Sequence, residues 1–227
     1  MATSIAPAEY HAQLEDALEH LPISSITEYR KGQTIYSPGR SSKNIYLVIA
    51  GKVEVSQIAE DGSEVLLEIV RVNELFGESA LLAAPPSERA TAFENVKLMV
   101  WPAACIEDLV IKRPRLAVAL LQVLAQRNAE LSRRIESFAI DSIEKRLARS
   151  LLRFSERLGT PEEDGSVRLM LFTHALLSRY VGTSREVVTL HMNRLRKQGF
   201  VRYSRRGIFL VRDALQPPGG ECVSPVS

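Results

Sequence analysis

The sequence of 227 residues predicts an α+β fold with a β-roll, a long dimerisation helix and a C-terminal winged helix-turn-helix. Short apolar runs separated by turn residues fill residues 23–102, which indicates closely spaced strands. Helical periodicity returns near Ala103, and two short helices joined by a glycine turn follow later. The expected parts are a helical segment at 1–22, the roll at 23–110, the dimerisation helix at 111–138, the winged unit at 139–215 and a disordered tail at 216–227.

The net charge differs between the two halves of the chain. Residues 1–110 carry a net charge of −8, whereas residues 111–137 carry +4 and residues 138–227 carry +6. A basic back half favours contact with a polyanion. The sequence contains neither a signal peptide nor an apolar run long enough for a membrane span, so a cytoplasmic protein with no membrane contact is expected.

The first elements alternate between helix, strands and turns. Residues 9–21 have the spacing of a short amphipathic helix. Within the roll, Asp61-Gly62 separates two apolar runs and predicts a tight hairpin. Pro114 suits the first turn of a long helix, because its missing N–H costs little there.

A heptad follows Pro114 and predicts a two-stranded coiled-coil seam. The polar Asn128 inside this stripe favours a dimer, since it can pair with its symmetry mate and fix the register. A helix packed on its own roll gives the same stripe, and that alternative stays open. The seam residues are Ala117, Leu121, Leu124, Asn128, Leu131, Ile135 and Phe138.

A helix is expected at 142–158, a polar loop at 159–166, and then the helix-turn-helix. Thr173 caps the first helix, Gly182 makes the turn, and Thr183 or Ser184 caps the second. The exposed start of the second helix enters the major groove, where Arg pairs with guanine and Glu with cytosine. A wing with a basic tip follows at 200–211. The predicted DNA-binding residues are Thr173, His174, Ser178, Thr183, Ser184, Arg185, Glu186, Thr189, Leu190, Arg194, Arg205 and Arg206.

The segment Val181–Val188 resembles the recognition segment of the Crp/Fnr family, the cAMP receptor protein-like bacterial transcription regulators. The resemblance extends from about residue 23 to 215. It implies a cyclic-nucleotide-binding-type roll, and it implies that the pair Arg185 and Glu186 reads a G·C step. Many members carry a second reading Arg where this chain has Leu190, so a different half-site is expected at that position.

The segment Phe76–Leu81 and Arg89 resemble the family's phosphate cassette. The resemblance implies a cyclic nucleotide, cAMP or another, as effector. Glu78 would then accept from a ribose hydroxyl and Arg89 would pair with the phosphate. Alternatively, Glu78 and Arg89 form a structural ion pair. The candidate effector-binding residues are Phe76, Gly77, Glu78, Ser79, Arg89, Ala90, Leu131 and Ser132.

Two positions depart from the cAMP-binding pattern. Ala90 replaces the usual Ser or Thr, and Leu131-Ser132 replaces a Thr-Ser pair that meets adenine. An apolar Leu131 closes the seam without ligand and predicts ligand-independent DNA binding. Two readings therefore stay open. Either a cyclic nucleotide controls DNA binding, or the chain binds DNA without a ligand.

Other cofactors and functions fit the sequence less well. Cys105 and Cys222 are too few for an iron–sulfur cluster, and they support neither a disulfide framework nor a metal site. Residues 23–102 contain no His that could bind haem or form the metal site of a cupin-like enzyme. A regulatory module of an enzyme or channel shares the roll but leaves the winged unit unexplained. We expect a regulator rather than an enzyme, with double-stranded DNA, a second copy of the chain and RNA polymerase as partners. The acidic front surface either meets the polymerase or is only solvated.

Overall fold

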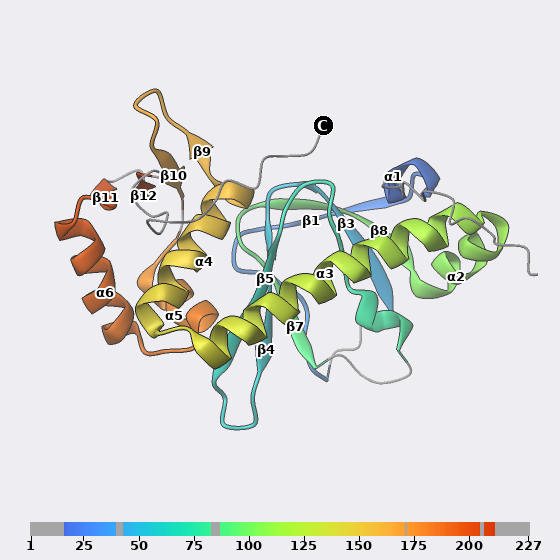
Figure 1. Cartoon of the computed structure of the whole chain (residues 1–227). Coiled ribbons are helices and arrows are strands. Elements are labelled where there is room, and N and C mark those ends of the chain that lie inside the picture. The colour runs from blue at the N-terminus through green and yellow to red at the C-terminus, as the bar shows by residue number, and fades with distance from the viewer. Residues whose placement is uncertain (1–15, 40–42, 83–86, 171, 205–206, 212–227) are drawn as a thin grey trace, which may run out of the picture.

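The computed structural model describes residues 16–39, 43–82, 87–170, 172–204 and 207–211. A β-roll lies in the middle of the molecule with a winged helical unit at one end, and one long helix runs along the roll toward the winged unit (Figure 1). The α+β architecture predicted from the sequence is confirmed. Within the described ranges, no helix is long and apolar enough to cross a membrane.

Two antiparallel four-stranded sheets form the roll, with strand orders β1-β8-β3-β6 and β2-β7-β4-β5. Apolar side chains from both sheets fill the space between them, and three stacked rings, Tyr36, Tyr46 and Phe76, lie among them. The hairpin predicted at Asp61-Gly62 joins β4 and β5. The strands are β1 Ser25–Tyr29, β2 Thr34–Tyr36, β3 Asn44–Ala50, β4 Val53–Ile58, β5 Glu64–Val70, β6 Leu75–Phe76, β7 Glu88–Ala92 and β8 Val96–Pro102, with the short helix η1 at Glu78–Leu81.

The helices flanking the roll differ at their ends from the sequence expectation. Helix α1 covers Ala17–His20, and the earlier part of the helix expected at 9–21 lies outside the described residues. Helix α2 covers Ala103–Lys112, and α3 covers Pro114–Ile140. The long helix therefore begins at Pro114 and not at residue 111, because the residue before a proline avoids the helical region, and Arg113 has φ −133° and ψ 79°.

The winged unit packs directly on the roll. Its core includes Leu66 and Ile69 of β5 together with apolar residues of all three of its helices. It also contains a four-stranded sheet of order β11-β12-β10-β9. Its elements are α4 Ile143–Leu158, β9 Thr160–Pro161, β10 Val167–Leu169, α5 His174–Val181, α6 Arg185–Lys197, β11 Val201–Ser204 and β12 Gly207–Leu210.

Candidate nucleic-acid interface and effector pocket

Local capping fixes where the two helices of the helix-turn-helix begin. The Thr173 side chain accepts a hydrogen bond from the Leu176 N–H at the start of α5. Gly182 ends α5 with φ 70°, and a Cβ at this position would lie 2.9 Å from the ring of Phe138, so the turn requires glycine. Of the two predicted caps for α6, Ser184 performs this role by accepting from the Val187 N–H.

The start of α6 presents charged side chains to solvent. Arg185 and Glu186 are exposed, while Val188 and Met192 are buried on the opposite face. Hydrogen bonds from its own backbone N–H and from the Ser184 hydroxyl lower the pKa of Glu186, so its carboxylate is an acceptor at neutral pH. The helix thus offers a donor and an acceptor side by side, the chemistry needed to read a G·C pair.

Other predicted DNA contacts differ in accessibility. Leu190 is 52% exposed on the outer face of α6. Ser178 is buried and its hydroxyl donates to the Ala175 carbonyl, so the prediction that it contacts DNA is wrong. Arg205 and Arg206 at the wing tip lie outside the described residues.

Two further predicted contacts, His174 and Thr189, are bonded to each other. His174 Nδ1 is 2.8 Å from Thr189 Oγ1, and its Nε2 is 2.8 Å from the hydroxyl oxygen of Tyr203 on β11. Arg194, predicted as a contact, is exposed in the last turns of α6, and Arg196 and Lys197 follow it.

One face of α3 remains apolar and open. The side chains of Leu121 and Ile135 are 65% and 68% exposed, and Leu124 is also exposed. Asn128 is exposed on the same helix, whereas Ala117 is half-buried. Phe138, at the end of the predicted seam, packs beside the Gly182 turn and under the guanidinium of Arg146.

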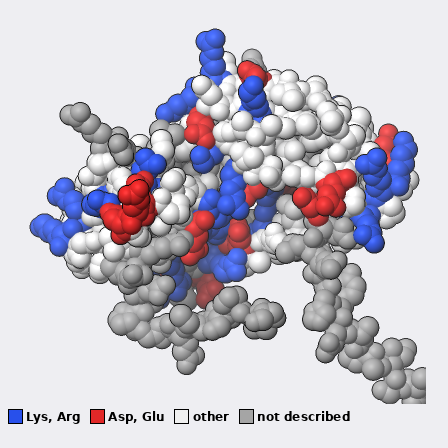
Figure 2. Space-filling view, turned by 90° about the horizontal axis from the view of Figure 1, so that it is seen from above, with Lys and Arg blue, Asp and Glu red and all other residues white. Residues whose placement is uncertain are grey.

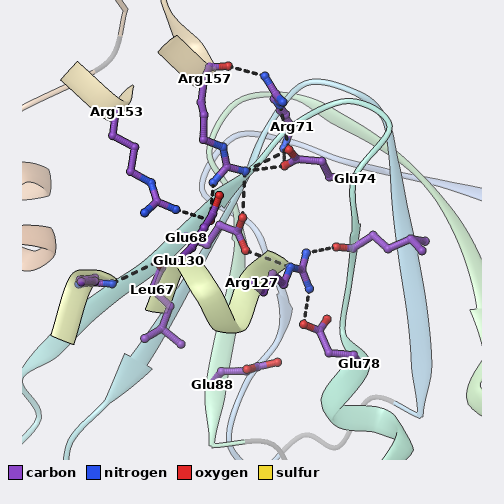
Figure 3. A network of polar contacts seen from close by, with 12 residues as sticks. Leu67, Glu68, Arg71, Glu74, Glu78, Glu88, Arg127, Glu130, Arg153 and Arg157 are labelled. Carbon is purple, nitrogen blue, oxygen red and sulfur yellow. Dashed lines mark hydrogen bonds and ion pairs between the residues drawn. The ribbon is translucent and has the colours of Figure 1, made fainter. Parts of the chain in front are cut away.

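A cavity of about 380 Å³ lies between β4, β5, β7, η1, α3, α4 and α5, and Glu78 and Leu131 of the predicted effector residues line it. Arg127 of α3 binds Glu78, and its Nε lies 3.4 Å from Glu68 of β5 (Figure 3). These carboxylates raise the pKa of Arg127 although burial opposes its charge. One side of the cavity is therefore lined by Arg127 paired with two glutamates.

The ion pairs continue from α3 into α4. Arg153 binds Glu130, and Arg157 lies 2.9 Å from Glu68 and 3.0 Å from Glu74 (Figure 3). In the space-filling view, acidic and basic side chains gather in the hollow between the two lobes of the molecule (Figure 2). This network was not predicted from the sequence. Its only local signal is spacing, since Arg127 and Glu130, and likewise Arg153 and Arg157, are separated by one turn of a helix.

The remaining predicted effector residues do not line the cavity. Arg89 points to Glu64 at 3.7 Å, so the alternative ion pair between Glu78 and Arg89 is also absent from the described structure. Ala90 is fully buried in the roll core, and Ser132 is exposed. Phe76 is buried in the aromatic stack, and Gly77 is a buried residue with φ 86° just before η1.

The cavity fits the phosphate of a cyclic nucleotide poorly. The hydroxyls of Ser79 and Tyr36 both donate to the Glu88 carboxylate, at 2.9 and 2.8 Å, and Glu88 lines the cavity. An anion entering here meets the side chains of Glu78 and Glu88, which line the cavity. Arg127, Arg153 and Arg157 are already paired with acidic side chains. Arg134 uses its terminal nitrogens on the carbonyls of Leu66, Leu67 and Tyr180.

Comparison with known proteins agrees with this architecture. Residues 26–113 match the cyclic nucleotide-binding domain family, and residues 145–216 match the Crp-like helix-turn-helix domain. A global nitrogen regulator from Synechococcus elongatus is 30% identical over 191 residues, covering 83% of this chain and 86% of that protein. The chain belongs to the Crp/Fnr family.

Some further relatives of this Crp/Fnr chain are described together with a ligand, and others are described only as regulators. A CRP-like cAMP-activated global transcriptional regulator from Mycobacterium tuberculosis is 27% identical over 188 residues, covering 81% of this chain and 82% of the relative. A solved CRP/FNR-family regulator from Thermus thermophilus is 31% identical with a TM-score of 0.71, and covers 86% of this chain and all of that structure. In the described ranges, no group of three or more His, Cys, Asp or Glu residues is placed to hold a metal ion.

Proposed function

We propose that this chain is a homodimeric transcription regulator that reads a palindromic DNA site with α6 and binds it without a cyclic nucleotide. The observation that carries the DNA-binding part is the start of α6, where Ser184 caps the helix and Arg185 and Glu186 project into solvent. The N-terminal end of such a helix enters the major groove, and this donor and acceptor recognise guanine and cytosine.

The exposed stripe of α3 supports a dimer. Leu121, Leu124, Leu131 and Ile135 are large apolar residues left in solvent by a single chain, and they follow the heptad spacing. Packing two copies of α3 along this stripe buries them and places Asn128 where it can pair with its mate. A two-fold dimer presents its recognition helices about one helical turn of DNA apart, which accounts for a palindromic site.

Two features of the cavity support binding without a ligand. The cavity's basic side chains are occupied by the chain's own carboxylates and carbonyls, as Arg127 is by Glu78. Leu131 lines the cavity and is also a seam position, so an apolar contact there holds the two copies of α3 together without adenine between them. A relative from Mycobacterium tuberculosis is described as cAMP-activated, but this chain differs from the cAMP-binding pattern at Ala90 and Leu131. We propose RNA polymerase as a further partner, since the relatives are transcriptional regulators.

The deciding experiment is selection of fragmented genomic DNA on the purified protein, with and without cAMP, followed by sequencing. We expect the same palindrome to be enriched in both samples. Enrichment only with cAMP would contradict ligand-independent binding, and failure to enrich any common sequence would contradict sequence-specific DNA recognition. A variant carrying Arg185→Ala serves as the matched control for contacts made by α6.

A further inference from the structure

The imidazole of His174 joins the first helix, the recognition helix and the wing. It is the first residue of α5, and it contacts Thr189 on α6 and Tyr203 on β11, each across 2.8 Å. The His174 and Tyr203 rings meet edge to face with centroids 5.9 Å apart. A side chain in this position restrains how α6 and the wing lie relative to each other.

A third hydrogen bond fixes which ring nitrogen carries the proton. The Thr189 hydroxyl donates to the Arg185 carbonyl across 2.8 Å. A hydroxyl has one hydrogen, so Thr189 can only accept from His174, and Nδ1 of the ring must be the donor. In a neutral imidazole Nε2 is then an acceptor, and the Tyr203 hydroxyl donates to it. A single series of hydrogen bonds thus runs from Tyr203 through His174 and Thr189 to the backbone of Arg185.

The surroundings favour the neutral ring. Burial and the positive charge of Arg185 lower the pKa of His174 below its usual value of 6.5. Burial raises the pKa of Tyr203 although Arg196 opposes this, so the phenol keeps its hydrogen. The charged groups that act on the two rings are Arg185 and Arg196 of α6. Each of these arginines disfavours a further positive charge on the ring beside it.

We infer that His174 is a positioning residue that ties α6 to the wing and thereby orients Arg185, and that it does not bind a DNA phosphate. The inference rests on the proposed DNA-binding function. It also limits what Thr189 can read, because its hydroxyl is used within the protein. Its methyl group and the neighbouring Leu190 are then left to contact bases, so an apolar contact such as one to a thymine methyl is expected at the middle of the half-site.

The first test needs no DNA. Nitrogen NMR of the full chain labelled with ¹⁵N-histidine, at about pH 7.5, reports the protonation of each ring, and a His174→Asn variant assigns the signal. Since the pKa of His174 is lowered, the ring is neutral at this pH. We expect a protonated Nδ1 and an unprotonated Nε2. A proton on Nε2 alone, or on both nitrogens, overturns the inference.

The second test uses DNA affinity. The variants His174→Phe and Tyr203→Phe should each weaken binding to the selected palindrome about three- to tenfold, as expected for loss of one or two hydrogen bonds. The double variant should bind no worse than His174→Phe, because the Tyr203 hydroxyl acts through the imidazole. Additive losses overturn the inference, since they show that Tyr203 contacts DNA by itself.

The third test separates positioning from phosphate contact. Arg194→Ala removes an exposed cation and should reduce the salt dependence of binding by about one counterion per contact. His174→Phe should leave the salt dependence at the wild-type value while relaxing base preference at the position read by Arg185. A salt slope reduced as in Arg194→Ala overturns the inference. If the wild-type chain binds no specific site at all, the proposed function fails, whereas the NMR result still decides the hydrogen-bond assignment.

Discussion

Strand alternation decides which charged side chains reach the interior of the roll. Along β7, Ala90 and Ala92 are buried, and Glu88 shares their face because successive side chains point to opposite sides of a strand. Arg89 therefore points outward and meets Glu64, while the Glu88 carboxylate receives the Tyr36 and Ser79 hydroxyls. The Glu88 carboxylate thus lies where the resemblance to cAMP binders implies a phosphate. Ligand-free DNA binding therefore depends on the contact that Leu131 makes.

Replacing Leu131 by Thr is expected to weaken DNA binding in the absence of ligand by more than tenfold. Full burial of one Leu side chain contributes about 1.5–3 kcal/mol, and Leu131 is 48% exposed in the single chain, so dimerisation gains about half of this in each of the two subunits. The measurement is fluorescence anisotropy with the selected palindrome and no nucleotide. Leu131→Met, which keeps an apolar side chain, is the control, and unchanged affinity of Leu131→Thr would disprove the role of this residue.

Replacing Arg185 by Ala is expected to cost about 1–3 kcal/mol per contact and to relax base choice at one symmetric position of the site. The reason is loss of the bidentate donor at the exposed start of α6. Repeating the selection with the variant gives the base preference at every position. Arg30→Ala on the roll, also an exposed arginine, should leave the enriched sequence unchanged. Full discrimination by the Arg185 variant would mean that α6 is not the recognition helix.

At the scale of elements, α5 is held against β5 by charges as well as by apolar packing. Arg179 of α5 lies 2.6 Å from Glu54 and 2.7 Å from Glu64, and Arg157 of α4 binds Glu68. These pairs connect residues far apart in the sequence, since Arg179 and Glu54 are separated by 125 positions and Arg157 and Glu68 by 89. The arrangement fixes where α6 stands relative to α3.

The number of residues between two interacting side chains explains which structural features the sequence could predict. The caps Thr173 and Ser184, the turn at Gly182 and the place of Pro114 in the first turn of α3 follow from neighbouring residues, and the structure has them in place. The pairs of Arg157 and Arg179 depend on how two separate units pack, for which single-sequence spacing carries little information. The burial of Ser178 was also not predicted, and its hydroxyl donates to the Ala175 carbonyl within its own helix.

Acid is expected to loosen the contact between α5 and β5. Burial opposes ionisation of Glu64, but the Ser56 hydroxyl and Arg179 hold its pKa below the usual 4.5. A group with a lowered pKa in the packed state contributes stability above its unperturbed pKa, and this contribution is lost as pH falls through the lowered value. Small-angle scattering should therefore show a larger radius of gyration at about pH 3.5 than at about pH 5.5.

The same contact can be opened at neutral pH by substitution. Arg179→Ala should enlarge the radius of gyration at about pH 7, because Glu54 then loses its arginine and Glu64 keeps only Arg89, 3.7 Å away on the roll itself. Lys97→Ala is the control, since Lys97 pairs with Glu28 on the exposed surface of the roll and bridges no second unit. If both variants scatter as the wild type does, apolar packing alone holds α5 on β5.

On the scale of the whole molecule, α3 serves three surfaces at once. Its inner side packs on the roll through Leu116 and Ala119, and Arg127 lines the cavity and binds Glu78. Its C-terminal end meets the helix-turn-helix through Phe138 beside Gly182. The face left over carries exposed apolar side chains such as Ile135. In the proposed dimer, a change in how the two copies of α3 pack is therefore expected to shift the two helix-turn-helix units.

Placing a charge on that face is expected to abolish the dimer and DNA binding together. In Ile135→Lys, two ammonium groups would face each other across an apolar seam and lose solvent without a counter-charge, which a short coiled coil does not tolerate. Light scattering coupled to size-exclusion chromatography should report about half the wild-type mass, and binding to a palindrome should fall to the level of a single half-site. Ile23→Lys changes a residue that is 91% exposed near the start of the roll, and it should leave both properties unchanged. A dimer that persists in Ile135→Lys but disappears in Ile23→Lys would move the interface from α3 to the roll, and the two copies of α6 would then need a different spacing on DNA.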